Sequence, residues 1–78
     1  MQQPYQPIDC DLYDELVALI MRRQHCAIRY WNDGEESAIA DQLIDIYSQD
    51  KQEFLRLKSG ITIRLDALIS VDQLDFKN

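Results

Sequence analysis

The sequence contains few of the residues that build phosphate loops, metal sites and catalytic centres. Gly34 and Gly60 are the only glycines among 78 residues, which excludes a Gly-rich phosphate loop. The two cysteines, Cys10 and Cys26, and the single His25 lack the CxxC or HxxxH spacing of a zinc site, and no nucleophile motif accompanies the histidine. A chain this short also leaves little room for a pocket that excludes water. We therefore expect a protein that is not an enzyme and that uses no metal or cofactor.

Long apolar runs and a secretion signal are lacking as well. No run approaches the length that crosses a bilayer, and the N-terminus shows neither the charged nor the apolar region of a secretory signal. We therefore expect a cytoplasmic location, in which Cys10 and Cys26 stay reduced. Each thiol is expected to pack as a small hydrophobe. His25 is expected on the surface or at the end of a helix.

Basic residues are scarce where acidic residues gather. The chain has 14 acidic and 8 basic residues, a net charge of −6, and no Lys or Arg before Arg22 or between Arg29 and Lys51. Such a surface repels phosphate backbones, because nucleic-acid binding is driven largely by Lys and Arg. The pattern favours a basic protein partner over direct binding of DNA or RNA. An acidic surface that serves only solubility is the alternative.

The first third of the chain predicts an extended arm and an amphipathic helix. Two prolines hold residues 1–8 extended. Apolar residues recur at helical spacing over residues 11–23, which predicts a helix there. Asp9 or Asp11 is expected to cap its N-terminus, where acidic side chains suit the helix dipole. Capping explains two of the four carboxylates near this end more readily than it explains all four.

The rest of the chain predicts short strands joined by tight links. Alternation of apolar and polar residues predicts strands over residues 26–31, 53–57, 61–65 and 68–72. The run Asn32-Asp33-Gly34-Glu35 predicts a hairpin turn, since Asn, Asp and Gly accept positive φ. We expect Trp31, beside this turn, to pack in the core or against the turn rather than to bind a ligand.

One segment is ambiguous. Residues 36–46 fit a helix by the spacing of Ile39, Leu43 and Ile46, but the preceding turn favours a strand to about Ala40 followed by irregular structure. Residues 47–52 are expected to form a polar connection, and residues 73–78 a weakly ordered tail. The predicted fold is one domain over residues 1–78, mainly β with one N-terminal α-helix, in which five strands over residues 26–72 close into a small barrel.

Four blocks of the sequence resemble a known family. In order along the chain they are Y-Q-P-I-D-C-D-L-Y-D at 5–14, D-G-E at 33–35, E-F-L-R-L at 53–57 and I-R-L-D-A-L-I-S at 63–70. They resemble the Rho-binding antiterminator family, the Rof (YaeO) proteins of enteric and related bacteria. The first block is quite specific, whereas the last is shared by many small barrels.

The resemblance implies a fold, a partner and a function. It implies an Sm-like, SH3-like barrel preceded by one helix, with residues 36–46 as strand plus irregular segment. It implies binding to the N-terminal RNA-binding region of the hexameric transcription terminator Rho, where the family blocks RNA loading and so reduces termination. RNA itself is not the expected ligand, and the free protein is expected to be a monomer.

The candidate contact residues lie mostly at the start of the predicted helix. The main contact is predicted to comprise Asp9, Asp11, Tyr13, Asp14 and Glu15, with Tyr5 adding stacking or hydrogen bonds. Asp11, Tyr13 and Asp14 carry over from the matching motif. Asp45 and Asp50 form a predicted second patch, in a segment that matches the family poorly. Leu12 departs from the family pattern, so either the contact is rearranged or Leu12 packs inward.

Two other functions compete with this prediction. An Sm-like protein that binds RNA or forms rings would need a basic or aromatic RNA surface. An acidic mimic of nucleic acid, aimed at another basic protein such as a nuclease or repressor, fits the charge pattern equally well. Only the family blocks point to Rho.

Overall fold

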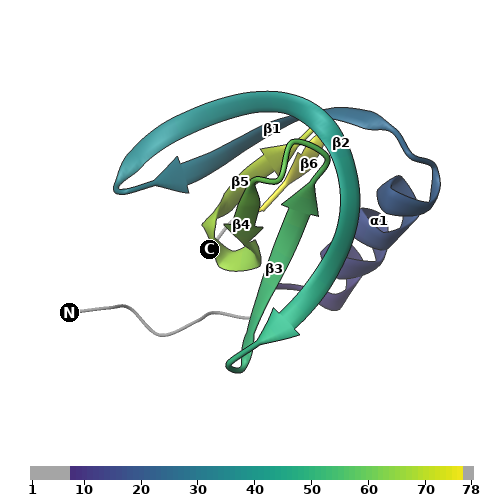
Figure 1. Ribbon diagram of the computed structural model, residues 1–78, viewed down its shortest axis with the longest axis horizontal. Helices are drawn as coiled ribbons and strands as arrows, with labels where there is room; N and C mark the ends of the chain where they lie inside the picture. Colours follow the sequence, from purple (N-terminus) through teal and green to yellow (C-terminus); the bar gives the residue numbers. More distant parts are fainter. Residues whose placement is uncertain (1–7, 77–78) are drawn as a thin grey trace.

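The computed structural model describes residues 8–76 as one helix followed by a curved antiparallel sheet (Figure 1). The sheet has six strands in the order β4-β3-β2-β1-β5-β6, so β4 and β6 are its two edges. The elements are α1 Cys10–Met21, β1 His25–Asn32, β2 Glu35–Gln49, β3 Gln52–Leu57, β4 Thr62–Arg64, the 3₁₀ turn η1 Leu65–Ala67, β5 Leu68–Val71 and β6 Leu74–Asp75. The prediction of a mainly β fold with one N-terminal helix is confirmed. The sheet is not closed, and a barrel of five strands is not confirmed.

Local side-chain and backbone chemistry determines both ends of α1. The carboxylate of Asp9 accepts a hydrogen bond of 2.8 Å from the Asp11 N–H and caps the helix, so the first of the two predicted caps is correct. At the other end, Arg23 adopts a φ of 52°. Its N–H donates to the Ile20 carbonyl at 3.0 Å, and the next N–H donates to Leu19 at 3.4 Å. These two bonds form a Schellman motif, which ends the helix two residues before the predicted end.

Two tight turns connect the first three strands. Asp33 and Gly34 have φ values of 53° and 81° and join β1 to β2, as the sequence predicts. Asp50 and Lys51 have φ values of 53° and 63° and join β2 to β3. Positive φ at both central residues matches the twist of paired strands, which is why two-residue turns of this kind close hairpins. The prediction of a polar connection over residues 47–52 is therefore wrong, because only Asp50 and Lys51 lie outside the strands.

The ambiguous segment is a single long strand. Over residues 36–46 the helical alternative is wrong, and so is the expectation of irregular structure after Ala40. β2 instead continues to Gln49 and changes partner on the way: it pairs with β1 up to Gln42 and with β3 from Leu43 onward. The register shifts between Leu43 and Asp45, where an extra residue bends the strand without ending it. Figure 1 shows the resulting arch of β2 over the molecule.

The C-terminal segment is packed as far as the structure describes it. Leu74 and Asp75 form β6 on the outer edge of β5, and the Phe76 N–H donates a hydrogen bond of 2.9 Å to the Ile69 carbonyl. The Phe76 side chain is only 4% exposed. The expectation of a weakly ordered tail is wrong for residues 73–76, since burial of this ring holds the segment in place. Residues 77–78 lie outside the described residues.

A single hydrophobic core joins the helix to the sheet. Leu16 and Leu19 of α1 are buried together with side chains from every strand except β6, and with Phe76 after it. The members with the largest fully buried side chains are Leu16, Ile28, Leu43, Leu55, Leu57, Leu65, Leu68 and Val71. Within residues 8–76, no helix is long and apolar enough to cross a membrane.

Candidate partner-binding surface

The N-cap and the N-terminal half of α1 present four exposed carboxylates. Asp9, Asp11, Asp14 and Glu15, here called the acidic helix surface, are all exposed. Asp11, Asp14 and Glu15 share one face because residues three and four apart are neighbours on a helix. The opposite face carries Leu16, which is fully buried. Burial of the apolar face thus points the carboxylates outward.

Within residues 8–76, no ion pair neutralises the carboxylates of the acidic helix surface. Among the described residues, none of the four forms an ion pair, and Asp9 alone accepts a hydrogen bond, from the helix backbone. The basic residues of this region, Arg22 and Arg23, lie past the other end of α1. The surface therefore keeps its charge available for a cationic partner.

Tyr13 and Leu12 sit between the acidic helix surface and the core. Both are half-buried and pack against the buried cluster. Of the two alternatives for Leu12, the inward-packed one is correct. Tyr13 is held by the same packing and is partly exposed. Tyr5 lies outside the described residues.

The second predicted patch is divided between two places. Asp45 lies at the bend of β2 and Asp50 in the turn after that strand, five residues on, a span of roughly 16 Å in an extended strand. Asp45 belongs to a cluster with a cation: its Oδ1, which makes no hydrogen bond, lies 3.9 Å from Nε of Arg56. The Arg56 guanidinium lies 4.7 Å from the centre of the Tyr47 ring. Asp50 is exposed beside Lys51. The structure does not bring Asp45 and Asp50 together as one acidic patch.

The cysteines and the histidine differ in their surroundings. Cys26 is buried, as predicted, and its burial together with the nearby Asp72 carboxylate raises its pKa to about 12. The thiol is therefore protonated and a poor nucleophile at neutral pH. Cys10 is exposed, so the expectation that it packs is wrong, because it occupies the first, outward-facing position of α1. His25 is exposed at the start of β1, in agreement with the expected surface position.

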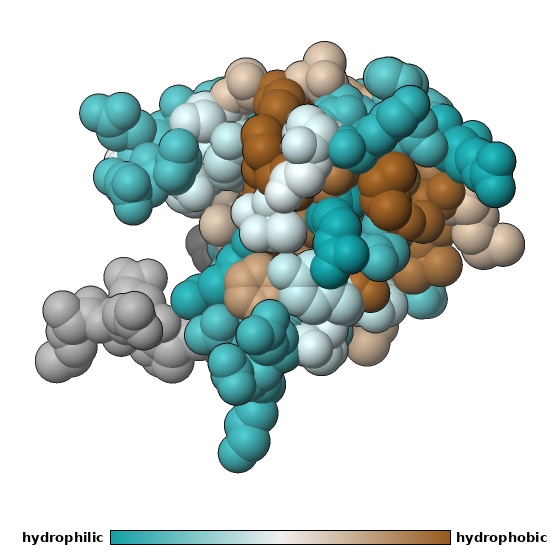
Figure 2. Space-filling view, in the orientation of Figure 1, coloured by the Kyte–Doolittle hydropathy of each residue, from teal (hydrophilic) through white to brown (hydrophobic). Residues whose placement is uncertain are grey.

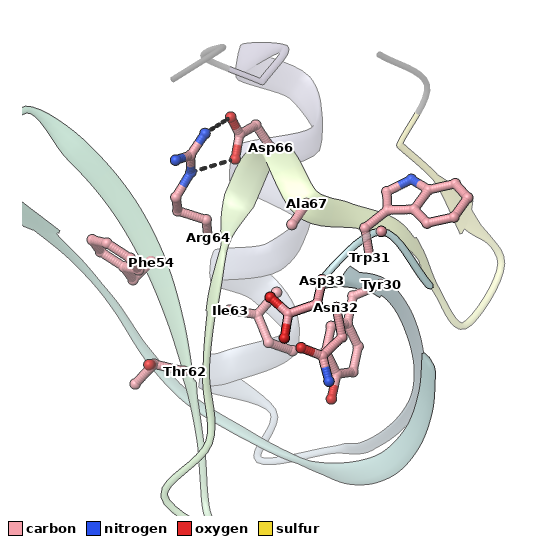
Figure 3. A pocket seen from close by; sticks show the side chains of 11 residues that line it. Tyr30, Trp31, Asn32, Asp33, Phe54, Thr62, Ile63, Arg64, Asp66 and Ala67 are labelled. Carbon is pink, nitrogen blue, oxygen red and sulfur yellow. Dashed lines mark hydrogen bonds and ion pairs between the residues drawn. The ribbon is translucent and has the colours of Figure 1, made fainter. Parts of the chain in front are cut away.

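Trp31 is the residue that sequence reasoning misplaced most clearly. It is 53% exposed at the end of β1, where packing in the core or against the turn was predicted. Alternation along β1 contained the correct signal: Ile28 faces the core and Tyr30 is half-buried, so Trp31 faces away. The ring lies at the rim of an open cleft of about 640 Å³ that also contains Asp33 (Figure 3).

Comparisons with known proteins give no match from which a function could be inferred. The chain matches no protein-family model and no curated protein. Within residues 8–76, no group of three or more His, Cys, Asp or Glu side chains is placed to hold a metal ion.

Proposed function

We propose that this protein inhibits Rho-dependent transcription termination by binding the N-terminal RNA-binding region of Rho with the acidic helix surface. The observation that carries the proposal is the exposure of Asp9, Asp11, Asp14 and Glu15 on a helix whose other face is anchored in the core. The choice of Rho as the partner rests on the sequence blocks that resemble the Rho-binding antiterminators. The proposed setting is the cytoplasm, and the proposed free state is a monomer with an Sm-like, SH3-like fold.

The mechanism is competition for cations. A site that binds RNA presents Lys and Arg to phosphates, together with aromatic faces for bases. Carboxylates held on a rigid helix can occupy the same cations, and bidentate Arg–carboxylate pairs are the strongest of these contacts. Tyr13, which is partly exposed and precedes Asp14 in the sequence, adds a ring and a hydroxyl to the proposed contact. RNA then loads onto Rho poorly, because its primary binding region is occupied.

A ring-forming or RNA-binding function is less well supported. In the described sheet the two edges are β4, with three residues, and β6, with two, so each edge offers only a short ladder to a second copy. The acidic helix surface repels phosphates. A gel shift with RNA at low salt separates this alternative, which requires a shift, from the proposed function, which requires none.

An acidic mimic aimed at another basic protein shares the same surface and differs only in partner. Calorimetry with purified Rho over a salt series, with C-rich RNA as competitor, tests the choice. Binding that weakens with salt and is displaced by the RNA supports Rho as the partner. Absence of binding at low salt would assign the surface to a different basic protein.

Asp14→Arg tests the surface itself. Reversing a carboxylate that is paired and buried in the complex is expected to weaken binding to Rho by about 2–5 kcal/mol, whereas a rim charge costs little. Asp75→Arg is the matched control, because Asp75 is exposed on β6 and the change in net charge is the same. If both variants bind Rho as the wild type does while keeping the wild-type melting curve, the helix surface is not the contact.

A further inference from the structure

A second feature of the surface is the cleft beneath the tip of the β1–β2 hairpin. Its walls come from residues 30–34 on one side and from Phe54, residues 62–64, Asp66 and Ala67 on the other (Figure 3). It is open and measures about 640 Å³. In Figure 1 the hairpin tip lies on the opposite side of the molecule from α1. Figure 2 shows hydrophilic side chains gathered over this tip. The cleft is therefore separate from the acidic helix surface.

The lining of the cleft combines aromatic rings with negative charge. Tyr30 and Phe54 are half-buried in its walls, and Trp31 stands 53% exposed at its rim. Asp33 is exposed in the hairpin turn and lines the same cleft, and in Figure 3 the Trp31 indole points away from its carboxylate. Rings of this kind attract cations to their faces, and Trp does so most strongly.

The basic residue in the described lining is already engaged. Arg64 Nε donates to Asp66 Oδ1 at 2.8 Å, and a second guanidinium nitrogen contacts Asp66 Oδ2 at 2.5 Å. The Asp66 side chain is only 9% exposed, which fixes this bidentate pair within the wall. The charge that faces an incoming group is therefore the carboxylate of Asp33. A phosphate is disfavoured there, and a cation is favoured.

From this complementarity we propose that the cleft binds an arginine or lysine side chain on a segment of a partner protein, with the cation beside Asp33 and the aliphatic stem among the rings that line the cleft. The assignment goes beyond the proposed function, because it concerns a separate surface and its test contains no Rho. It gives the protein two contacts for basic partners, one on α1 and one on the hairpin. When both surfaces bind the same partner, the overall affinity exceeds that of either contact alone, because the second contact forms within an existing complex.

The test uses the whole chain and a peptide with one cation, acetyl-Gly-Arg-Gly-amide, with acetyl-Gly-Gln-Gly-amide as the uncharged control. Trp31 is the only tryptophan in the chain, so its fluorescence reports on this cleft, and amide chemical shifts locate the contact. The arginine peptide is expected to cause saturable changes confined to residues 30–34 and 62–67. The glutamine peptide is expected to cause none.

Asp33→Asn has a matched control in this chain. Asp33 and Asp50 are both exposed turn residues with a φ of 53°, a conformation that Asn accepts readily. Asp33→Asn is expected to weaken binding of the arginine peptide by about two- to fivefold, as for loss of one exposed ion pair, and Asp50→Asn to leave it unchanged.

Three results would overturn the proposal. One is the absence of saturable changes at residues 30–34 with the arginine peptide. Another is an equal loss in Asp33→Asn and Asp50→Asn, which would reflect net charge rather than a site. The third is a saturable shift of the same amides by oligouridylate that Asp33→Asn strengthens, which would assign the cleft to nucleic acid.

Discussion

Replacing Leu16 by alanine tests whether α1 is fixed to the sheet, on which the acidic helix surface depends. Leu16 is 0% exposed and directly follows Glu15 in the sequence. Truncation of a buried leucine costs about 2–5 kcal/mol, because transfer free energy is lost and a cavity remains. A domain of this size has a total free energy of unfolding of only about 4–12 kcal/mol. The variant is therefore expected to fold, but with a large part of its stability removed.

Urea unfolding followed by circular dichroism measures this loss. The midpoint is expected to fall while the slope with denaturant stays constant, since the surface exposed on unfolding hardly changes. In a heat scan the Tm is expected to fall by at least about 8 °C, at about 4 °C or more for each kcal/mol in a domain of this length. Glu15→Ala is the control, because the adjacent side chain is exposed and its removal is expected to change stability by no more than about 0.5 kcal/mol. If Leu16→Ala loses less than about 1 kcal/mol, α1 is not seated on the core and the reasoning from burial fails.

Two further predictions address the tail and a carboxylate in the sheet. Phe76→Ala is expected to lower the free energy of unfolding by about 3–5 kcal/mol in urea, because the ring is buried, whereas exposed Gln73→Ala should leave it nearly unchanged. Equal stability of the two variants would contradict the packed tail. Hydrogen bonds from the Ser59 side chain and the Gln42 backbone hold the pKa of Asp41 below its ordinary value of 3.8. Its contribution to stability is therefore complete above that value and is lost as the pH falls through the lowered pKa. As the pH falls through this range, the free energy of unfolding measured in urea should decrease more steeply for the wild type than for Asp41→Asn. Equal decreases in the two proteins would contradict this role of Asp41.

Features with local causes could be predicted from the sequence. The helix cap, for which Asp9 was one of two candidates, and the turn at Asp33 and Gly34 each depend on neighbouring residues, and both are found in the structure. The helix itself was predicted from the spacing of its apolar residues, and Asp11, Asp14 and Glu15 are exposed on it. The end of α1 was missed because Arg23 adopts a left-handed conformation that glycine would have signalled and arginine does not.

Features that depend on distant contacts could not be predicted. Nothing near Ala40 indicates that β2 continues, because the strand is sustained by exchanging β1 for β3 as its partner. The packing of Phe76 depends on β5 and the core, and the local sequence of the tail is polar. The cleft beside Trp31 likewise forms only when residues 30–34 are brought near residues 62–67.

The sharing of β2 between two partners also determines how the domain comes apart. Since β2 pairs with β1 up to Gln42 and with β3 from Leu43 onward, one continuous strand joins the two hairpins with no loop between them. β5, near the end of the chain, pairs with β1 and so belongs to the same sheet. The sheet is expected to unfold as one cooperative unit rather than in separate pieces. A perturbation of the β2–β3 turn is therefore expected to reach the core against which α1 packs. A partner that binds α1 is expected to stabilise the whole sheet.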